Sequence, residues 1–138
     1  MAVIEELIRL EDNGSISFGN YLMDEKKKVL DFEVAGNLYK VKTYKDITKL
    51  EKNGKMLLET VPGATIHNFD MGAKNIEFSV ESDDDVQITM ELEPEKDYKL
   101  LVDDVLVGKI SSNIGGKVNF SVELNNNCSA VKIEKLSK

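Results

Sequence analysis

Strict alternation of apolar and polar residues is the feature that most constrains the fold of this chain. It is clearest in three stretches, Ile76–Val80, Val86–Leu92 and Val118–Leu124, where every second side chain is apolar. A period of two places the apolar side chains on one face of a strand and the polar ones on the other. The pattern therefore predicts strands that each have one buried and one solvated face.

Residue pairs that suit tight turns separate the apolar segments. They are Asn13-Gly14, Gly36-Asn37, Asn53-Gly54 and Asp103-Asp104. Gly, Asn and Asp tolerate the positive φ that two-residue hairpin turns require. Because such a turn joins antiparallel neighbours, the spacing predicts antiparallel sheets. The first ten residues fit either a helix or a strand. Their apolar side chains fall at helical spacing, but the segment leads directly into a predicted hairpin.

The sequence pattern changes near residue 72, from short segments rich in lysine to cleaner alternation in which acids dominate. Together with breaks at Pro62-Gly63 and Met71-Gly72, this change divides the chain into two parts. Residues 1–72 are predicted to form an antiparallel, hairpin-rich region. Residues 73–138 are predicted to form a small, jelly-roll-like β-sandwich. Its six expected strands are 75–82, 85–93, 97–103, 105–110, 117–124 and 130–136. The chain is thus expected to be all-β, and whether the two parts are separate domains or two sheets of one domain stays open.

The charge balance disfavours several classes of partner. The net charge is −7, with 10 basic and 12 acidic side chains in residues 1–72 and 8 and 13 in residues 73–138. A negative surface repels phosphate, which argues against nucleic acid and anionic membranes as partners. No apolar run approaches the roughly 20 residues of a membrane span, and no signal peptide is evident. With Cys128 as its single cysteine, we expect a cytoplasmic protein.

The densest acidic cluster, Asp83-Asp84-Asp85, is the candidate metal site. Carboxylate oxygens gathered in one loop can bind calcium, although the spacing of a helix–loop–helix calcium site is absent. The alternative is a plain turn between two strands, because Asp is common in turns.

Three other residue groups have weaker claims to chemistry. His67 is the single imidazole and has Asp70 as its nearest acid along the sequence, but it matches no metal motif. Cys128 has no neighbouring base or cation to activate its thiol. Gly115-Gly116-Lys117 lacks the full phosphate-loop spacing and precedes a strand, so a turn is expected there. No catalytic residue is therefore predicted.

Aromatic residues supply the candidate ligand-binding positions. Phe18, Phe32, Phe78 and Phe120 fit the dry faces of strands. Of the four tyrosines, Tyr98 and Tyr44 are the candidates for contact with a sugar, against the alternative that they are structural.

Several stretches together carry a family resemblance: Ser17–Tyr21, Asp31–Gly54 and Glu59–Phe69. They resemble a family of short bacterial proteins often labelled endosialidase or endosialidase-like. The segment Tyr98–Leu124 also resembles the accessory β-sandwiches attached to carbohydrate-active enzymes. What these likenesses imply is a non-catalytic part of a larger protein.

Sialidase chemistry itself does not fit the residues. Sialidases hold the substrate carboxylate with a cluster of arginines, because guanidinium pairs bidentately with carboxylate, and Arg9 is the single arginine of this chain. A propeller at about 40–50 residues per blade also exceeds 138 residues. The endosialidase label therefore transfers no catalytic residue.

Three functions follow, in order of preference. The first is a non-catalytic protein that acts by self-assembly or by binding a protein partner, through strand edges able to pair with another chain. The second is a carbohydrate-binding module, with calcium as an optional aid. The third is a small glycan hydrolase, which needs two carboxylates about 5–10 Å apart, although no pair stands out.

Overall fold

The computed structural model of the chain is all-β and describes residues 3–72, 75–124 and 128–136. No helix occurs within these ranges, so none there is long and apolar enough to cross a bilayer. The strands are β1 (Ile8–Leu10), β2 (Ile16–Phe18), β3 (Lys27–Val34), β4 (Asn37–Tyr44), β5 (Ile47–Lys52), β6 (Lys55–Val61), β7 (Thr65–Met71), β8 (Asn75–Glu81), β9 (Val86–Glu91), β10 (Asp97–Val102), β11 (Val105–Ser111), β12 (Lys117–Val122) and β13 (Cys128–Lys135).

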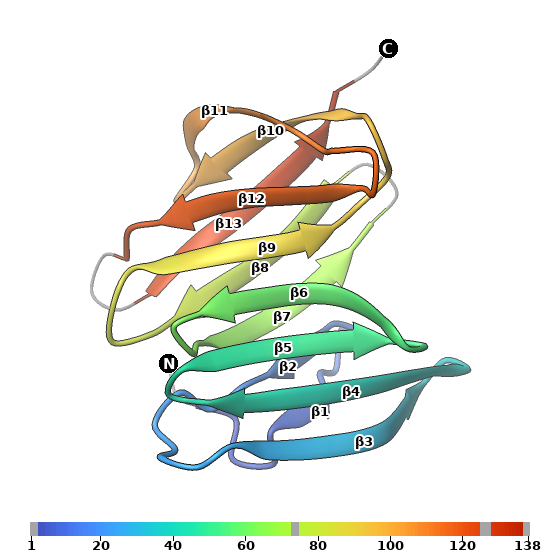
Figure 1. Ribbon diagram of the computed structural model, residues 1–138, viewed down its shortest axis with the longest axis vertical. Helices are drawn as coiled ribbons and strands as arrows, with labels where there is room; N and C mark the ends of the chain where they lie inside the picture. The colour runs from blue at the N-terminus through green and yellow to red at the C-terminus, as the bar shows by residue number, and fades with distance from the viewer. Residues whose placement is uncertain (1–2, 73–74, 125–127, 137–138) are drawn as a thin grey trace.

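The strands form two antiparallel sheets that face each other (Figure 1). One sheet has seven strands in the order β1-β2-β7-β8-β13-β10-β11, and the other has six in the order β12-β9-β6-β5-β4-β3. The N-terminal strands lie at one end of the long axis, and β10, β11 and β12 lie at the other (Figure 1). The prediction of an all-β, antiparallel fold is confirmed.

The hairpins follow from the predicted turn residues. Asn53 and Gly54 join β5 to β6 with φ values of 51° and 84°, and Asp103 and Asp104 join β10 to β11 with φ values of 51° and 65°. The turn between β3 and β4 lies one residue earlier than predicted, at Ala35 and Gly36. A positive φ strains most side chains, so these residue types fix where each strand ends.

The N-terminal segment contains a strand and no helix within its described part. Glu5 and Glu6 lie in a turn, Leu7 has a φ of 74°, and β1 begins at Ile8. Strand β1 pairs with β2 and lies at the edge of the 7-stranded sheet. The helical alternative fails because Leu7 takes a left-handed conformation, which interrupts a helix. Met1 and Ala2 lie outside the described residues.

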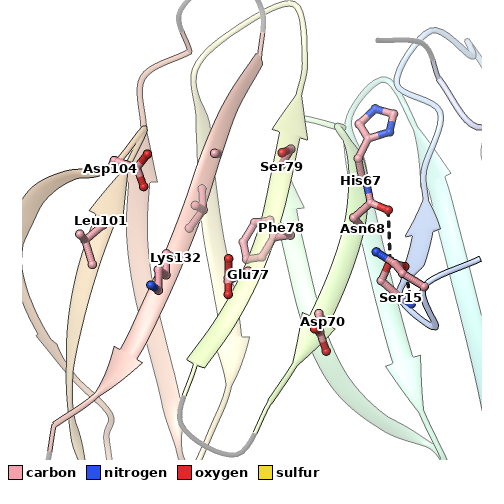
Figure 2. Close-up of a pocket in the computed structure, with 13 residues that line it drawn as sticks. Ser15, His67, Asn68, Asp70, Glu77, Phe78, Ser79, Leu101, Asp104 and Lys132 are labelled. Carbon is pink, nitrogen blue, oxygen red and sulfur yellow. Dashed lines mark hydrogen bonds between the residues drawn. The ribbon is translucent and has the colours of Figure 1, made fainter. Parts of the chain in front are cut away.

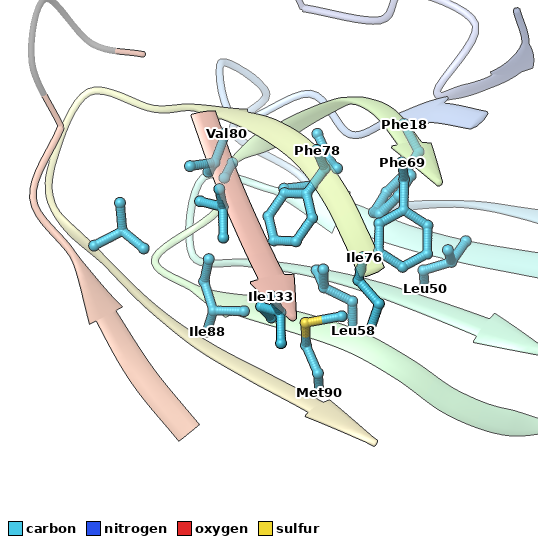
Figure 3. Close-up of a cluster of buried hydrophobic side chains, with 14 of the residues drawn as sticks. Phe18, Leu50, Leu58, Phe69, Ile76, Phe78, Val80, Ile88, Met90 and Ile133 are labelled. Atoms are coloured by element: carbon cyan, nitrogen blue, oxygen red, sulfur yellow. The ribbon is translucent and has the colours of Figure 1, made fainter. Parts of the chain in front are cut away.

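One core fills the space between the sheets. Its side chains come from both sheets and from both sides of residue 72 (Figure 3). Phe69 is central, because its ring lies 6.1 Å from that of Phe18 at an edge-on angle and 5.6 Å from that of Phe78. Such aromatic contacts add to the free energy gained from burial.

The connection near residue 72 joins two hydrogen-bonded neighbours. Strand β7, before this position, pairs with β8, after it, from Thr65 opposite Glu81 to Met71 opposite Ile76. In the other sheet, β6 pairs with β9 in the same way across the predicted boundary. Both sheets are therefore continuous from one part of the chain to the other.

Candidate functional site

A polar hollow of about 300 Å³ lies on the outer face of the 7-stranded sheet (Figure 2). Strands β7, β8 and β13 form its floor, where Glu77 and Ser79 flank the buried Phe78 and so point away from the core. Asp70 lies directly opposite Glu77 on β7, and Lys132 lies opposite Glu77 on β13. The β7–β8 pairing thus brings two carboxylates together, with a lysine from β13 beside them.

The rim of the hollow is held by hydrogen bonds among small polar side chains. The Ser15 hydroxyl lies 3.1 Å from Asn68 Oδ1 and 2.5 Å from Asn13 Oδ1 (Figure 2). Asn68 has a φ of 55° and sits where the register between β7 and β8 shifts. This bulge turns the end of β7 toward the loop before β2 and gives the hollow its side wall.

Negative charge dominates the hollow. Lys132 forms an ion pair of 3.1 Å with Glu134, which raises the pKa of the lysine, and Glu77 and Asp104 act in the same direction. Among the described residues, however, no three or more His, Cys, Asp or Glu side chains are grouped so that they could hold a metal ion. The hollow offers hydrogen-bonding groups for a hydroxylated molecule. The two rings in its lining, Phe78 and His67, are buried and present no open face on which a sugar could stack.

His67 lines the hollow and is tied to a buried carboxylate. Its Nε2 lies 2.9 Å from Glu81 Oε1, and the Tyr21 hydroxyl donates to Glu81 Oε2 at 3.0 Å. All three residues are at most 8% exposed. Burial, followed by the hydrogen bond to Glu81, raises the pKa of Tyr21. This chain of bonds fastens the segment after β2 to the sheet.

The partner of His67 is Glu81 rather than Asp70, its nearest acid in the sequence. Thr65 lies opposite Glu81 in the β7–β8 register, and His67 is two residues along the same strand. Side chains two residues apart share a face, so His67 and Glu81 meet. Asp70 lies beyond the bulge, opposite Glu77.

The three acids proposed for calcium lie in the exposed loop between β8 and β9. Asp84 Oδ1 accepts a hydrogen bond from the Asp85 backbone N–H at 2.8 Å, and Asp85 Oδ1 accepts one from Leu124 N–H at 3.1 Å. Asp83 is exposed beside them. Two of the carboxylates therefore hold backbone groups of this loop and of the segment after β12.

The two tyrosines proposed for ligand contact lie in different sheets. Tyr98 on β10 is 4% exposed, and its hydroxyl accepts a hydrogen bond from the Glu93 backbone N–H at 3.2 Å. Tyr44 is half-buried at the end of β4, on the outer face of the 6-stranded sheet. Tyr98 faces the core because it alternates with outward-facing Asp97 and Lys99.

The remaining sequence candidates occupy structural positions. Cys128 begins β13 and is half-buried, and burial raises the pKa of its thiol, with Glu81 adding to the effect. Gly115 and Lys117 flank a turn before β12, where both backbone N–H groups donate to Asn113 Oδ1 at 2.9 Å. The sequence also predicts a turn over residues 125–129. Cys128 and Ser129 instead belong to β13, and residues 125–127 lie outside the described residues.

An exposed apolar strand edge is the feature that the sequence analysis missed. Val105, Leu106 and Val107 are 66%, 59% and 60% exposed, and they open β11, which ends the order of the 7-stranded sheet. A register shift leaves Val107 without a partner on β10. The sequence did hold a signal, because three successive apolar residues break an otherwise alternating pattern.

Comparisons of this chain with protein-family models, with curated proteins and with solved structures found no match. The resemblance to endosialidase-like proteins therefore remains a prediction.

Proposed function

We propose that this is a non-catalytic binding protein that acts by joining another protein chain through the edge of β11. The observation that carries the proposal is the run of exposed apolar residues on that edge, Val105–Val107. An edge strand presents unpaired backbone N–H and C=O groups, and a second strand can add to them.

The composition of this edge supports pairing with a partner. Natural edge strands are commonly protected by lysine, proline or inward-pointing charge. On β11 the one lysine is Lys109, beyond Gly108, so the first three residues lack a protecting charge or proline and have only the bulge at Val107. Leu106 also lies opposite Leu101, which extends the apolar surface onto β10. Fully burying one such side chain contributes about 1.5–3 kcal/mol, so a partner that covered this surface would gain substantially.

The aromatic residues support this proposal over a carbohydrate-binding module. All nine Phe and Tyr residues lie in the described part of the chain, where seven are buried and two, Phe32 and Tyr44, are half-buried. A sugar ring stacks on an exposed aromatic face, and the polar hollow supplies none. We therefore place the protein-binding function first.

Sedimentation velocity over a range of concentrations tests the proposal. The wild-type chain is expected to form species heavier than its 15.5 kDa monomer, and Leu106→Lys is expected to abolish them. Ile114→Lys is the matched control, because Ile114 is 82% exposed but lies in the loop after β11.

If the wild-type chain stays monomeric, it and Leu106→Lys are used as baits in an extract of the source cells. A protein retained by the wild type and lost with Leu106→Lys supports the proposal. Monomers together with identical retention by both baits would overturn it.

A further inference from the structure

A basic face lies at the opposite end of the sandwich from β11. Lys28, Lys42 and Lys49 stand directly opposite one another across β3, β4 and β5. On β4, Lys42 alternates with the buried Val41 and Thr43, so this row of lysines faces away from the core. Lys40 lies two residues from Lys42 on the same face. A chain with a net charge of −7 therefore concentrates positive charge on three neighbouring strands.

This row of lysines works against stability. Like charges directly opposite each other on neighbouring strands destabilise a sheet. Partial burial lowers the pKa of Lys42, and the nearby lysines, including Lys28 and Lys49, lower it further. Acids offset part of the charge of two other lysines: Lys49 lies 3.6 Å from Glu51 and stands opposite Glu59 on β6, and Lys40 stands opposite Glu51. For Lys28 and Lys42 the structure shows no ion pair within the described residues. An anionic partner would relieve this repulsion.

Exposed apolar side chains lie beside the lysines. Leu38 is 46% exposed and shares the outer face of β4 with Lys40 and Lys42, and Leu30 is 60% exposed in the bulge of β3. A surface that combines lysine and leucine suits a partner carrying both carboxylates and apolar side chains. This composition favours a protein surface over a nucleic acid or a polysaccharide.

The β10–β11 hairpin of the same chain has the matching composition. Asp103 and Asp104 form its exposed turn, and Val105, Leu106 and Val107 follow directly with exposed apolar side chains. The hairpin and the basic face lie at opposite ends of the long axis (Figure 1). One molecule cannot bring the two together, but two molecules can.

We infer that the partner of the β10–β11 hairpin is a second copy of this chain: β11 adds to β3, the edge strand of that copy's 6-stranded sheet, and the turn aspartates lie on the adjoining β3–β5 basic face. The inference rests on the proposed function and names the partner for that edge. Because the two surfaces differ, the contact is heterologous, and each added copy leaves one free hairpin and one free face. Such a contact builds rings or open filaments rather than closed two-fold dimers.

Two variants, each with one surface disabled, test the inference by sedimentation velocity. The face variant carries Lys28→Thr and Lys42→Thr, which remove the repulsion and suit strand positions. The hairpin variant carries Asp104→Asn and Leu106→Lys, and Asn tolerates the positive φ of Asp104. Lys96→Thr with Lys117→Thr is the control, because it removes two exposed lysines away from both surfaces.

Each variant alone is expected to be monomeric, and an equimolar mixture is expected to give a complex of twice the 15.5 kDa chain mass and nothing larger. The control should assemble like the wild type. Raising the salt concentration from about 0.05 M to about 0.5 M should weaken the mixed complex several-fold, because screening reduces the attraction between the charges.

Assembly of the face variant alone at wild-type strength would overturn the inference, because it would show that the basic face is not needed. The proposed function would survive that result. A strictly monomeric wild type would also overturn the inference, and the Leu106-dependent capture of a different protein would then decide the proposed function.

Discussion

At the residue scale, one carboxylate connects three parts of the chain. Glu81 on β8 accepts one hydrogen bond from the Tyr21 hydroxyl and lies within hydrogen-bond distance of His67 on β7. When a buried polar group loses its hydrogen-bond partner, the free energy spent on removing it from water is no longer offset. Breaking one of these contacts therefore costs more than the strength of that hydrogen bond alone. The network therefore acts as an anchor for the segment after β2.

Replacing Tyr21 with Phe is expected to lower the free energy of unfolding by about 1–3 kcal/mol, because Glu81 loses a buried donor while the ring stays in place. Urea denaturation monitored by circular dichroism measures the change. Tyr44→Phe removes a hydroxyl from a half-buried ring and should leave the midpoint unchanged. Equal midpoints for the wild type and Tyr21→Phe would show that the bond is not stabilising.

The sequence identified His67 as the single imidazole but did not identify its partner. The β7–β8 register that brings it to Glu81 is followed by a bulge at Asn68, whose φ of 55° has no clear signature in the sequence. Asp70, the expected neighbour, is carried away by the same bulge. Register at this level depends on backbone geometry that single residues do not specify.

At the scale of single strands, alternation predicted the structure well. Strands expected at 75–82, 97–103 and 117–124 are found at Asn75–Glu81, Asp97–Val102 and Lys117–Val122. Turn residues set these limits locally, which is why the sequence was sufficient. The pairing of β2 with β7, β6 with β9 and β8 with β13 was not predictable, because each depends on packing between distant segments.

Strand β6 allows a direct test of its two faces. Leu58 is fully buried between the sheets, whereas a bulge at Leu57 places Met56 opposite Glu51 on the other face, where it is half-buried. Leu58→Ala is expected to lower the free energy of unfolding by about 2–5 kcal/mol, because it leaves a cavity in the core. Met56→Ala should cost clearly less. Equal losses, measured by thermal and urea unfolding, would contradict the assignment of the faces.

At the scale of the whole molecule, the two parts of the chain share both sheets. The sequence showed a change in character near residue 72, which corresponds to the two ends of one long sandwich (Figure 1). It could not show that β7 pairs with β8 and β6 with β9 across this position, since alternation says which face is buried but not which strand lies alongside. The shared core therefore suggests a single cooperative unit.

Separate expression of residues 1–72 and 73–138 tests that cooperativity. Each fragment is expected to be largely unfolded on its own, because cutting at this point exposes β6 and β7 on one side and β8 and β9 on the other, together with their core side chains. Mixing the fragments should restore the β-sheet circular dichroism signal and a sigmoidal unfolding transition, as exposed strand edges find their native partners. The point substitution Phe78→Ala in the second fragment should weaken this recovery, since Phe78 packs against Phe69 of the first. Two fragments that each unfold cooperatively alone would instead establish two independent domains joined edge to edge.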